Sequence, residues 1–146
     1  MNLNYSLKWM FVGSIIIGLY LNGMNILAYR FNDLYFSSKT LIYSGLLMAS
    51  NMCILEVFMS YNHSGKFDVN ALLLFVSMSV ILVLMLRNQF LVSDNDWLKR
   101  MISHHSTALT TSHNIVKITK NKKLKKLAKD IIDTQEKEIA LMISMI

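Results

Sequence analysis

The sequence contains no proline, five glycines and one cysteine among its 146 residues. Because proline and glycine mark turns and irregular segments, their scarcity argues against a turn-rich β fold and favours long helices. The single cysteine, Cys53, excludes an intramolecular disulfide and a zinc site built from cysteines. It lies inside an apolar run, where a thiol behaves as a small buried hydrophobic side chain.

Positive charge is also scarce in the first half of the chain. Residues 1–86 carry four basic and three acidic side chains, whereas residues 87–146 carry eleven and six, which together give a formal net charge of +6. The basic run NKKLKKLAK contains no aromatic residue and keeps Leu124 and Leu127 on one side of a helix. This pattern favours a solvated helix face near lipid headgroups over a nucleic-acid interface, so we expect no nucleic-acid partner.

Long apolar runs dominate the first ninety residues. They cover about 9–29, 41–61 and 70–87, and a membrane-spanning helix needs roughly 20 mostly apolar residues. A soluble helical core is the alternative, but such a core would need a partner surface to cover these runs. We therefore predict two domains, a three-span membrane domain over residues 1–90 and a helical hairpin over residues 91–146.

The lipid bilayer is thus the first expected partner, and the protein is expected to be an integral, multi-pass membrane protein. Basic residues near the ends of the spans lean towards a cytoplasmic hairpin, although single residues decide that balance. Within the second span, Asn51 and Glu56 are polar, and ionisable residues in spans are often functional. The methionines of the spans could form a thioether path for a soft cation, but methionine is also a common filler in helix packing.

The C-terminal third of the chain carries the chemistry, and its periodicity predicts two amphipathic helices. At about 100° per residue, His105 lies about 40° from Met101, and His104 lies about 60° away on the other side. On the second helix, Gln135 and Glu138 fall in a stripe that otherwise holds Leu, Ile and Met. Buried polar groups cost roughly 1–3 kcal/mol unless they are satisfied, so these two positions need a reason.

Asp94 or Asp96 is expected to cap the first of these helices. A turn at residues 121–123 would bring the polar residues of the second helix next to those of the first, where they could share a function. Folding about the turn collects polar and sulfur-containing side chains from both helices: Met101, His104, His105, Gln135, Glu138 and Met142. Imidazole and thioether ligands suit copper, whereas imidazole with carboxylate suits zinc or iron. We therefore predict a metal site, with copper as the favoured ion and zinc or iron as alternatives.

The same residues resemble the signature of the family called domain of unknown function 305. The resemblance rests on Met-Ile-x-His-His-x-x-Ala at 101–108 and Leu-Ala-x-x-Ile-Ile-x-x-Gln-x-x-Glu-Ile-x-x-Met at 127–142. The stretch Arg-x-Gln-x-x-Val-x-Asp at 87–94 and the three spans are similar to the membrane-anchored branch of that family. The resemblance implies a ferritin-like helical fold and copper-related function. It also implies a ligand set of Met101, His104, His105 and Met142, with Gln135 and Glu138 as ligands or as groups that orient the imidazoles.

Two departures from the family pattern concern the metal. Ser103 stands where the family usually has proline before the double histidine, and Thr111 stands where it often has methionine. Loss of that thioether weakens the expected preference for copper(I), although His113 on the flank of the helix could partly compensate.

One hairpin cannot bury its apolar stripe alone, so two chains are expected to pair as a four-helix bundle, giving a homodimer or higher oligomer. Three functions follow. The first is membrane-anchored metal binding, for copper sequestration, delivery or resistance. The second is a structural module with a buried His–Glu network. The third is a ferritin-like redox enzyme, which ranks last because the hairpin offers one well-placed carboxylate, Glu138.

Overall fold

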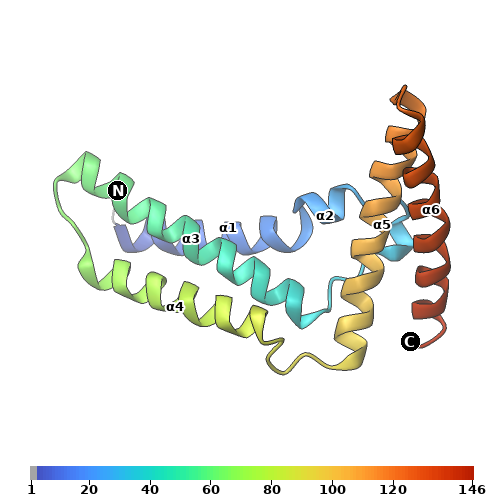
Figure 1. Ribbon diagram of the computed structural model, residues 1–146. Helices are drawn as coiled ribbons and strands as arrows, with labels where there is room; N and C mark the ends of the chain where they lie inside the picture. Colours follow the sequence, from blue (N-terminus) through green and yellow to red (C-terminus); the bar gives the residue numbers. More distant parts are fainter. Residues whose placement is uncertain (1–2) are drawn as a thin grey trace. The chain divides into compact units, whose positions relative to one another are not determined.

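The computed structural model describes residues 3–146 and is all-α (Figure 1). Its elements are α1 (Leu3–Tyr20), α2 (Gly23–Ile26), the 3-10 turn η1 (Phe31–Asp33), α3 (Lys39–Ser64), α4 (Val69–Arg87), α5 (Asp94–Ile118) and α6 (Lys122–Ile143). Contacts divide the chain into two units. Unit 1 is the chain up to Leu21 together with Lys39–Leu91, and unit 2 is Asn22–Ser38 together with Val92–Ile146. The segment 22–38 thus groups with the hairpin, whereas the sequence analysis had placed all of residues 1–90 in one membrane domain.

Unit 1 consists of α1, α3 and α4, with α3 packed against both of the others (Figure 1). Three segments are long and apolar enough to cross a membrane: Tyr5–Ile26, Lys39–Ser64 and Val69–Arg87. The all-α class and the three long apolar helices predicted from the sequence are therefore confirmed. The first helix ends earlier than the predicted run of 9–29, because α1 stops at Tyr20. Asn22 then caps the short helix α2, where its side chain accepts a hydrogen bond from the backbone N–H of Asn25.

Glycine allows α1 and α3 to approach closely. A Cβ added at Gly18 would lie 3.0 Å from the Cα of Gly45, which is tighter than nine in ten Cβ contacts in proteins. Small residues at such crossings are typical of helices that pack in membranes. Polar side chains in unit 1 form hydrogen bonds between its helices. Ser6 donates a hydrogen bond to the Glu56 carboxylate, and Ser50 donates one to the backbone carbonyl of Phe75 at 2.7 Å.

Unit 2 is built on the predicted hairpin of α5 and α6, which run antiparallel (Figure 1). Asn121 is the N-cap of α6, and its side chain accepts hydrogen bonds from the backbone N–H groups of Lys123 and Leu124. The chain reverses over residues 119–121, so the turn predicted at 121–123 lies two residues earlier, and Lys122 and Lys123 are helical. The N-cap of α5 is Ser93, not Asp94 or Asp96 as predicted. Asp96 instead completes a capping box, because its carboxylate accepts from the Ser93 backbone N–H while the Ser93 hydroxyl accepts from the Asp96 N–H.

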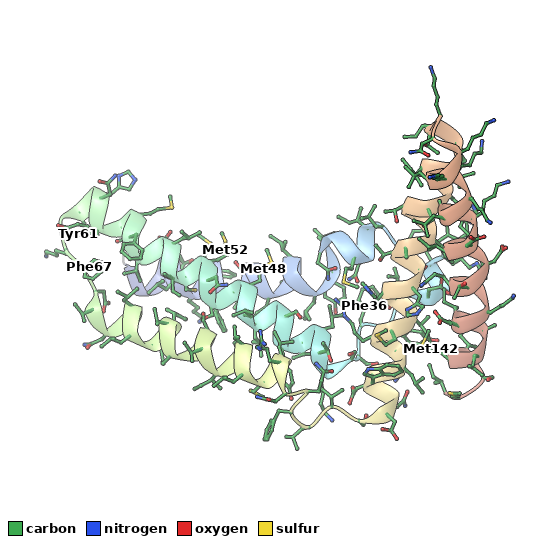
Figure 2. The ribbon with its side chains drawn as sticks, viewed as in Figure 1. Phe36, Met48, Met52, Tyr61, Phe67 and Met142 are labelled. Carbon is green, nitrogen blue, oxygen red and sulfur yellow. The ribbon has the colours of Figure 1, made fainter. Side chains whose placement is uncertain are left out.

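Apolar side chains from both helices close the hairpin. Ile102 and Leu109 of α5 pack with Ile139 and Met142 of α6, and all four are buried. Met101 packs against this cluster and is partly buried. The cluster lies towards the end of the hairpin that is opposite the α5–α6 turn, where Figure 2 labels Met142.

Candidate metal centre

His105 joins the two helices of the hairpin. Its Nδ1 lies 2.8 Å from the backbone carbonyl oxygen of Met101, one helical turn earlier, and its Nε2 lies 3.0 Å from Oε2 of Glu138 on α6. The His105 side chain is 13% exposed, whereas the Glu138 side chain is 47% exposed. The imidazole is therefore held inside the hairpin, and the carboxylate reaches it from the solvent edge.

The Met101 contact fixes which nitrogen of His105 carries hydrogen. A carbonyl oxygen only accepts hydrogen bonds, so Nδ1 must be the donor. Nε2 on the other side of the ring then faces Oε2 of Glu138 at 3.0 Å. The geometry is that of a histidine oriented by a backbone carbonyl, a common arrangement for metal-binding imidazoles.

The other predicted ligands do not converge on this pair to the same degree. His104 is exposed, and its ring centroid lies 6.2 Å from that of His105 with the planes 78° apart. Met142 is 7% exposed and belongs to the hydrophobic cluster, where Met101 also packs. Gln135 is half-buried on α6. In the part of the chain that the structure describes, no three side chains of the types His, Cys, Asp and Glu come together.

A second polar site on α5 was missed by the sequence analysis, and it binds the segment 22–38. The Ser106 hydroxyl donates to Oδ2 of Asp33 at 2.6 Å and accepts from the backbone N–H of Tyr29 at 2.8 Å. The Ser103 hydroxyl donates to the backbone carbonyl of Asp33 at 2.7 Å. Asp33, Ser103 and Ser106 are all at most 2% exposed. We call residues 22–38 the strap, because they cross α5 and are held there by buried hydrogen bonds.

The strap also contacts side chains of both hairpin helices. Nη2 of Arg30 lies 2.6 and 2.7 Å from the two carboxylate oxygens of Glu136, and this hydrogen bond raises the pKa of Arg30. The Tyr29 ring stacks on the His113 ring with centroids 4.7 Å apart. The His113 ring therefore contacts the strap.

Arg100 occupies an unusual position beside the strap. Its Nη2 contacts the thioether sulfur of Met24 at 2.8 Å, and desolvation by burial lowers its pKa. A thioether is a weak acceptor, so it compensates a guanidinium poorly.

The sequence did contain a signal for the strap. At about 100° per residue, positions 103, 106, 107 and 110 fall on the side of α5 opposite Met101 and His105. All four are serine or threonine. Small polar side chains on the back of an amphipathic helix allow another segment to approach closely, and the strap occupies that face.

Three helices long and apolar enough to cross a membrane precede the helical hairpin of α5 and α6. Residues 85–146 match the family described as Domain of unknown function (DUF305). Uncharacterized protein L153 of Acanthamoeba polyphaga mimivirus is 33% identical over 143 residues, which cover 98% of this chain and 92% of that protein. The chain therefore belongs to the same family as L153, with a DUF305 domain at its C-terminal end. No solved structure matches it.

Proposed function

We propose that this chain is a membrane-anchored metal-binding protein whose site is built around His105 and Glu138, and that the ion is copper. The observation that carries the proposal is the locked imidazole. Its Nδ1 is held by the Met101 carbonyl, and its Nε2 faces a carboxylate at 3.0 Å. A divalent ion bound between these two groups would have an imidazole nitrogen and a carboxylate oxygen as ligands, a donor pair that suits such ions.

Copper is supported by the identity of the donors. For a given set of nitrogen and oxygen donors, copper(II) binds more tightly than iron(II) or zinc(II). The imidazole and carboxylate of this site therefore favour copper over those two ions. His104 is exposed at the adjacent position and would supply a second imidazole, while Met101, Met142 and Gln135 would serve copper(I) or orient the imidazoles.

The exposure of the site favours sequestration or delivery over a resident cofactor. Glu138 is nearly half exposed and His104 is exposed, so a bound ion would remain accessible to an exchange partner. A ferritin-like redox enzyme is supported less, because such centres use several carboxylates. We further propose that the three apolar helices span the bilayer, that the hairpin lies on the cytoplasmic side, and that hairpins of two chains pair.

Metal titration of the full chain in mild detergent tests the metal site. We expect one copper ion to bind per hairpin, and the double variant His104→Ala, His105→Ala to lose tight binding while keeping its helical content. His113→Ala is the matched control, since its ring stacks on Tyr29 of the strap. Unchanged affinity in the double variant would refute the assignment.

The second candidate function is a structural His–Glu pair that fixes the register of α5 against α6. The ion-pair distance of 3.0 Å favours it. It predicts that the parent protein binds neither copper nor zinc, while His105→Ala lowers hairpin stability in metal-free buffer. Elemental analysis of the purified protein together with that stability measurement separates the two candidates.

A further inference from the structure

The end of the hairpin that contains its turn is strongly basic and partly apolar. We call residues 117–129 the hairpin tip. It carries seven lysines and no acidic residue, and all seven lysines are exposed: Lys117, Lys120, Lys122, Lys123, Lys125, Lys126 and Lys129. In Figure 2, nitrogen-ended side chains extend from the hairpin in this region. None of these lysines belongs to the proposed metal centre or contacts the strap in a hydrogen bond described above.

Large apolar side chains are exposed among the lysines. Ile118 is 75% exposed, Leu127 is 56% exposed and Leu124 is 38% exposed. Beside them α5 and α6 leave an open groove of about 330 Å³, whose apolar lining includes Ile115, Leu124, Leu127 and Ile131. Exposure of this apolar surface to water is unfavourable, because the free energy falls when apolar groups are buried.

Both properties fit one partner. From the geometry we infer that the hairpin tip docks on an anionic phospholipid surface, with its lysines at the headgroup phosphates and Ile118, Leu124 and Leu127 entering the interface. Lysines around an apolar helix face are typical of segments that lie on anionic membranes. The inference rests on the bilayer anchoring proposed above, because the apolar helices would keep the tip near such a surface. It does not rest on metal binding.

Nucleic acid fits the tip less well. Single-stranded nucleic acid binds to basic grooves through bases stacked on aromatic side chains. No Phe, Tyr or Trp follows Trp97 in the sequence, so the tip has no stacking platform of its own. Contact with lipid acyl chains, by contrast, stabilises exposed aliphatic side chains, whereas contact with phosphates does not.

The test places a fluorescent reporter on the tip of the full-length protein in lipid nanodiscs. Cys53→Ala removes the native thiol, and Ile118→Cys is labelled with an environment-sensitive dye. Asp133→Cys, exposed on α6 beyond the tip, is the matched control position. The discs contain phosphatidylcholine alone or phosphatidylcholine with phosphatidylglycerol, with or without lipids that carry a quencher in the acyl chain.

We expect the dye at 118 to shift to shorter wavelength and to be quenched in the anionic discs, but not in the neutral discs. The dye at 133 should change in neither. Since each basic residue contributes a factor of about five to binding at an anionic surface, Lys122→Glu, Lys123→Glu and Lys126→Glu together should reduce quenching at least fivefold. The same three positions changed to arginine should retain it, and Leu127→Ser should reduce it while the charge is unchanged.

Several results would overturn the inference. Equal quenching in neutral and anionic discs would remove the role of the lysines. No quenching in either, or tighter binding of a single-stranded RNA to the tip than of anionic lipid, would assign the tip to another partner. Copper titration of the glutamate variant separates this test from the metal proposal, because loss of quenching with retained copper binding concerns the tip alone.

Discussion

The Oγ atom of Ser106 lies 2.6 Å from Oδ2 of Asp33, although 73 residues separate them in the sequence, and both side chains are buried. The backbone carbonyl of the same aspartate accepts from Ser103, so Asp33 is fixed to α5 at two atoms. The loop that connects the first two apolar helices is therefore part of the hairpin unit. A substitution in that loop should therefore alter the stability of α5.

Removing the Asp33 carboxylate tests this relationship. Asp33→Ala leaves the buried Ser106 hydroxyl without its acceptor, which costs about 1–3 kcal/mol. Asp33→Asn keeps an acceptor oxygen and should cost less. Hydrogen exchange of the α5 amides in detergent measures the difference, and we expect faster exchange in Asp33→Ala. Asp130→Asn, at an exposed position of α6, is the control. Exchange in Asp33→Ala equal to that in the parent would show that the strap does not stabilise α5.

The strap also marks the limit of what the sequence could predict. Three apolar runs and two amphipathic periods each depend on residues close together in the chain, so the helices and the hairpin turn could be predicted. The strap is irregular and polar, and its place depends on hydrogen bonds across more than seventy residues, such as that from Ser106 to Asp33. No local pattern encodes such a contact. The serines on the back of α5 indicated only that something could approach there.

The geometry of the candidate metal centre was predictable to a similar extent. The periodicity correctly brought His105 to Glu138 across the hairpin. It also placed His104 in the same stripe, but adjacent residues on a helix point about 100° apart, so one partner side chain cannot reach both. The structure holds His105 inside the hairpin and leaves His104 exposed. Two residues of the same apolar stripe can therefore point in directions too different to contact the same side chain on the other helix.

The crossing of α1 and α3 gives a matched pair of glycine substitutions. A Cβ at Gly18 would meet the Gly45 backbone at 3.0 Å, whereas a Cβ at Gly13 meets nothing within 4 Å. Gly18→Ala should force the helices apart and lower the stability of unit 1 by about 1–3 kcal/mol, as overpacking does. Gly13→Ala should be neutral or stabilise the helix by up to about 1 kcal/mol, since alanine favours helix more than glycine does. Thermal unfolding in one detergent compares them. Equal effects of the two substitutions would contradict the close crossing.

The Arg30–Glu136 pair should contribute little to stability despite its short distances. The side chains are 46% and 34% exposed, and exposed ion pairs typically contribute about 1 kcal/mol or less. The hydrogen bond to Glu136 raises the pKa of Arg30, so its contribution is complete at any pH below the normal range of arginine and is lost only at higher pH. Ionisation of Arg30 should therefore cause no change in the contribution of the ion pair to stability near neutral pH, whereas added salt should reduce that contribution. A double-mutant cycle with Arg30→Gln and Glu136→Gln measures the coupling. A coupling energy above about 2 kcal/mol that resists salt would show that the pair is better shielded than its exposure indicates.

Substitution of Glu138 separates two possible roles for the carboxylate in the proposed metal centre. Glu138→Gln keeps the shape of the side chain but removes the charge that faces Nε2 of His105. Zinc(II) gains from an anionic oxygen donor, whereas copper(I) prefers soft neutral donors such as the thioethers of Met101 and Met142. We expect zinc affinity to fall by about 10–100-fold and copper(I) affinity to change by less than about threefold. Competition titrations with chelators of known affinity give both values. Glu136→Gln is the control, because that carboxylate contacts Arg30 of the strap. An equal loss for both ions would mean that Glu138 acts by orienting His105 and that the hairpin does not distinguish ions through this oxygen. Unchanged affinity for both would place the metal away from Glu138.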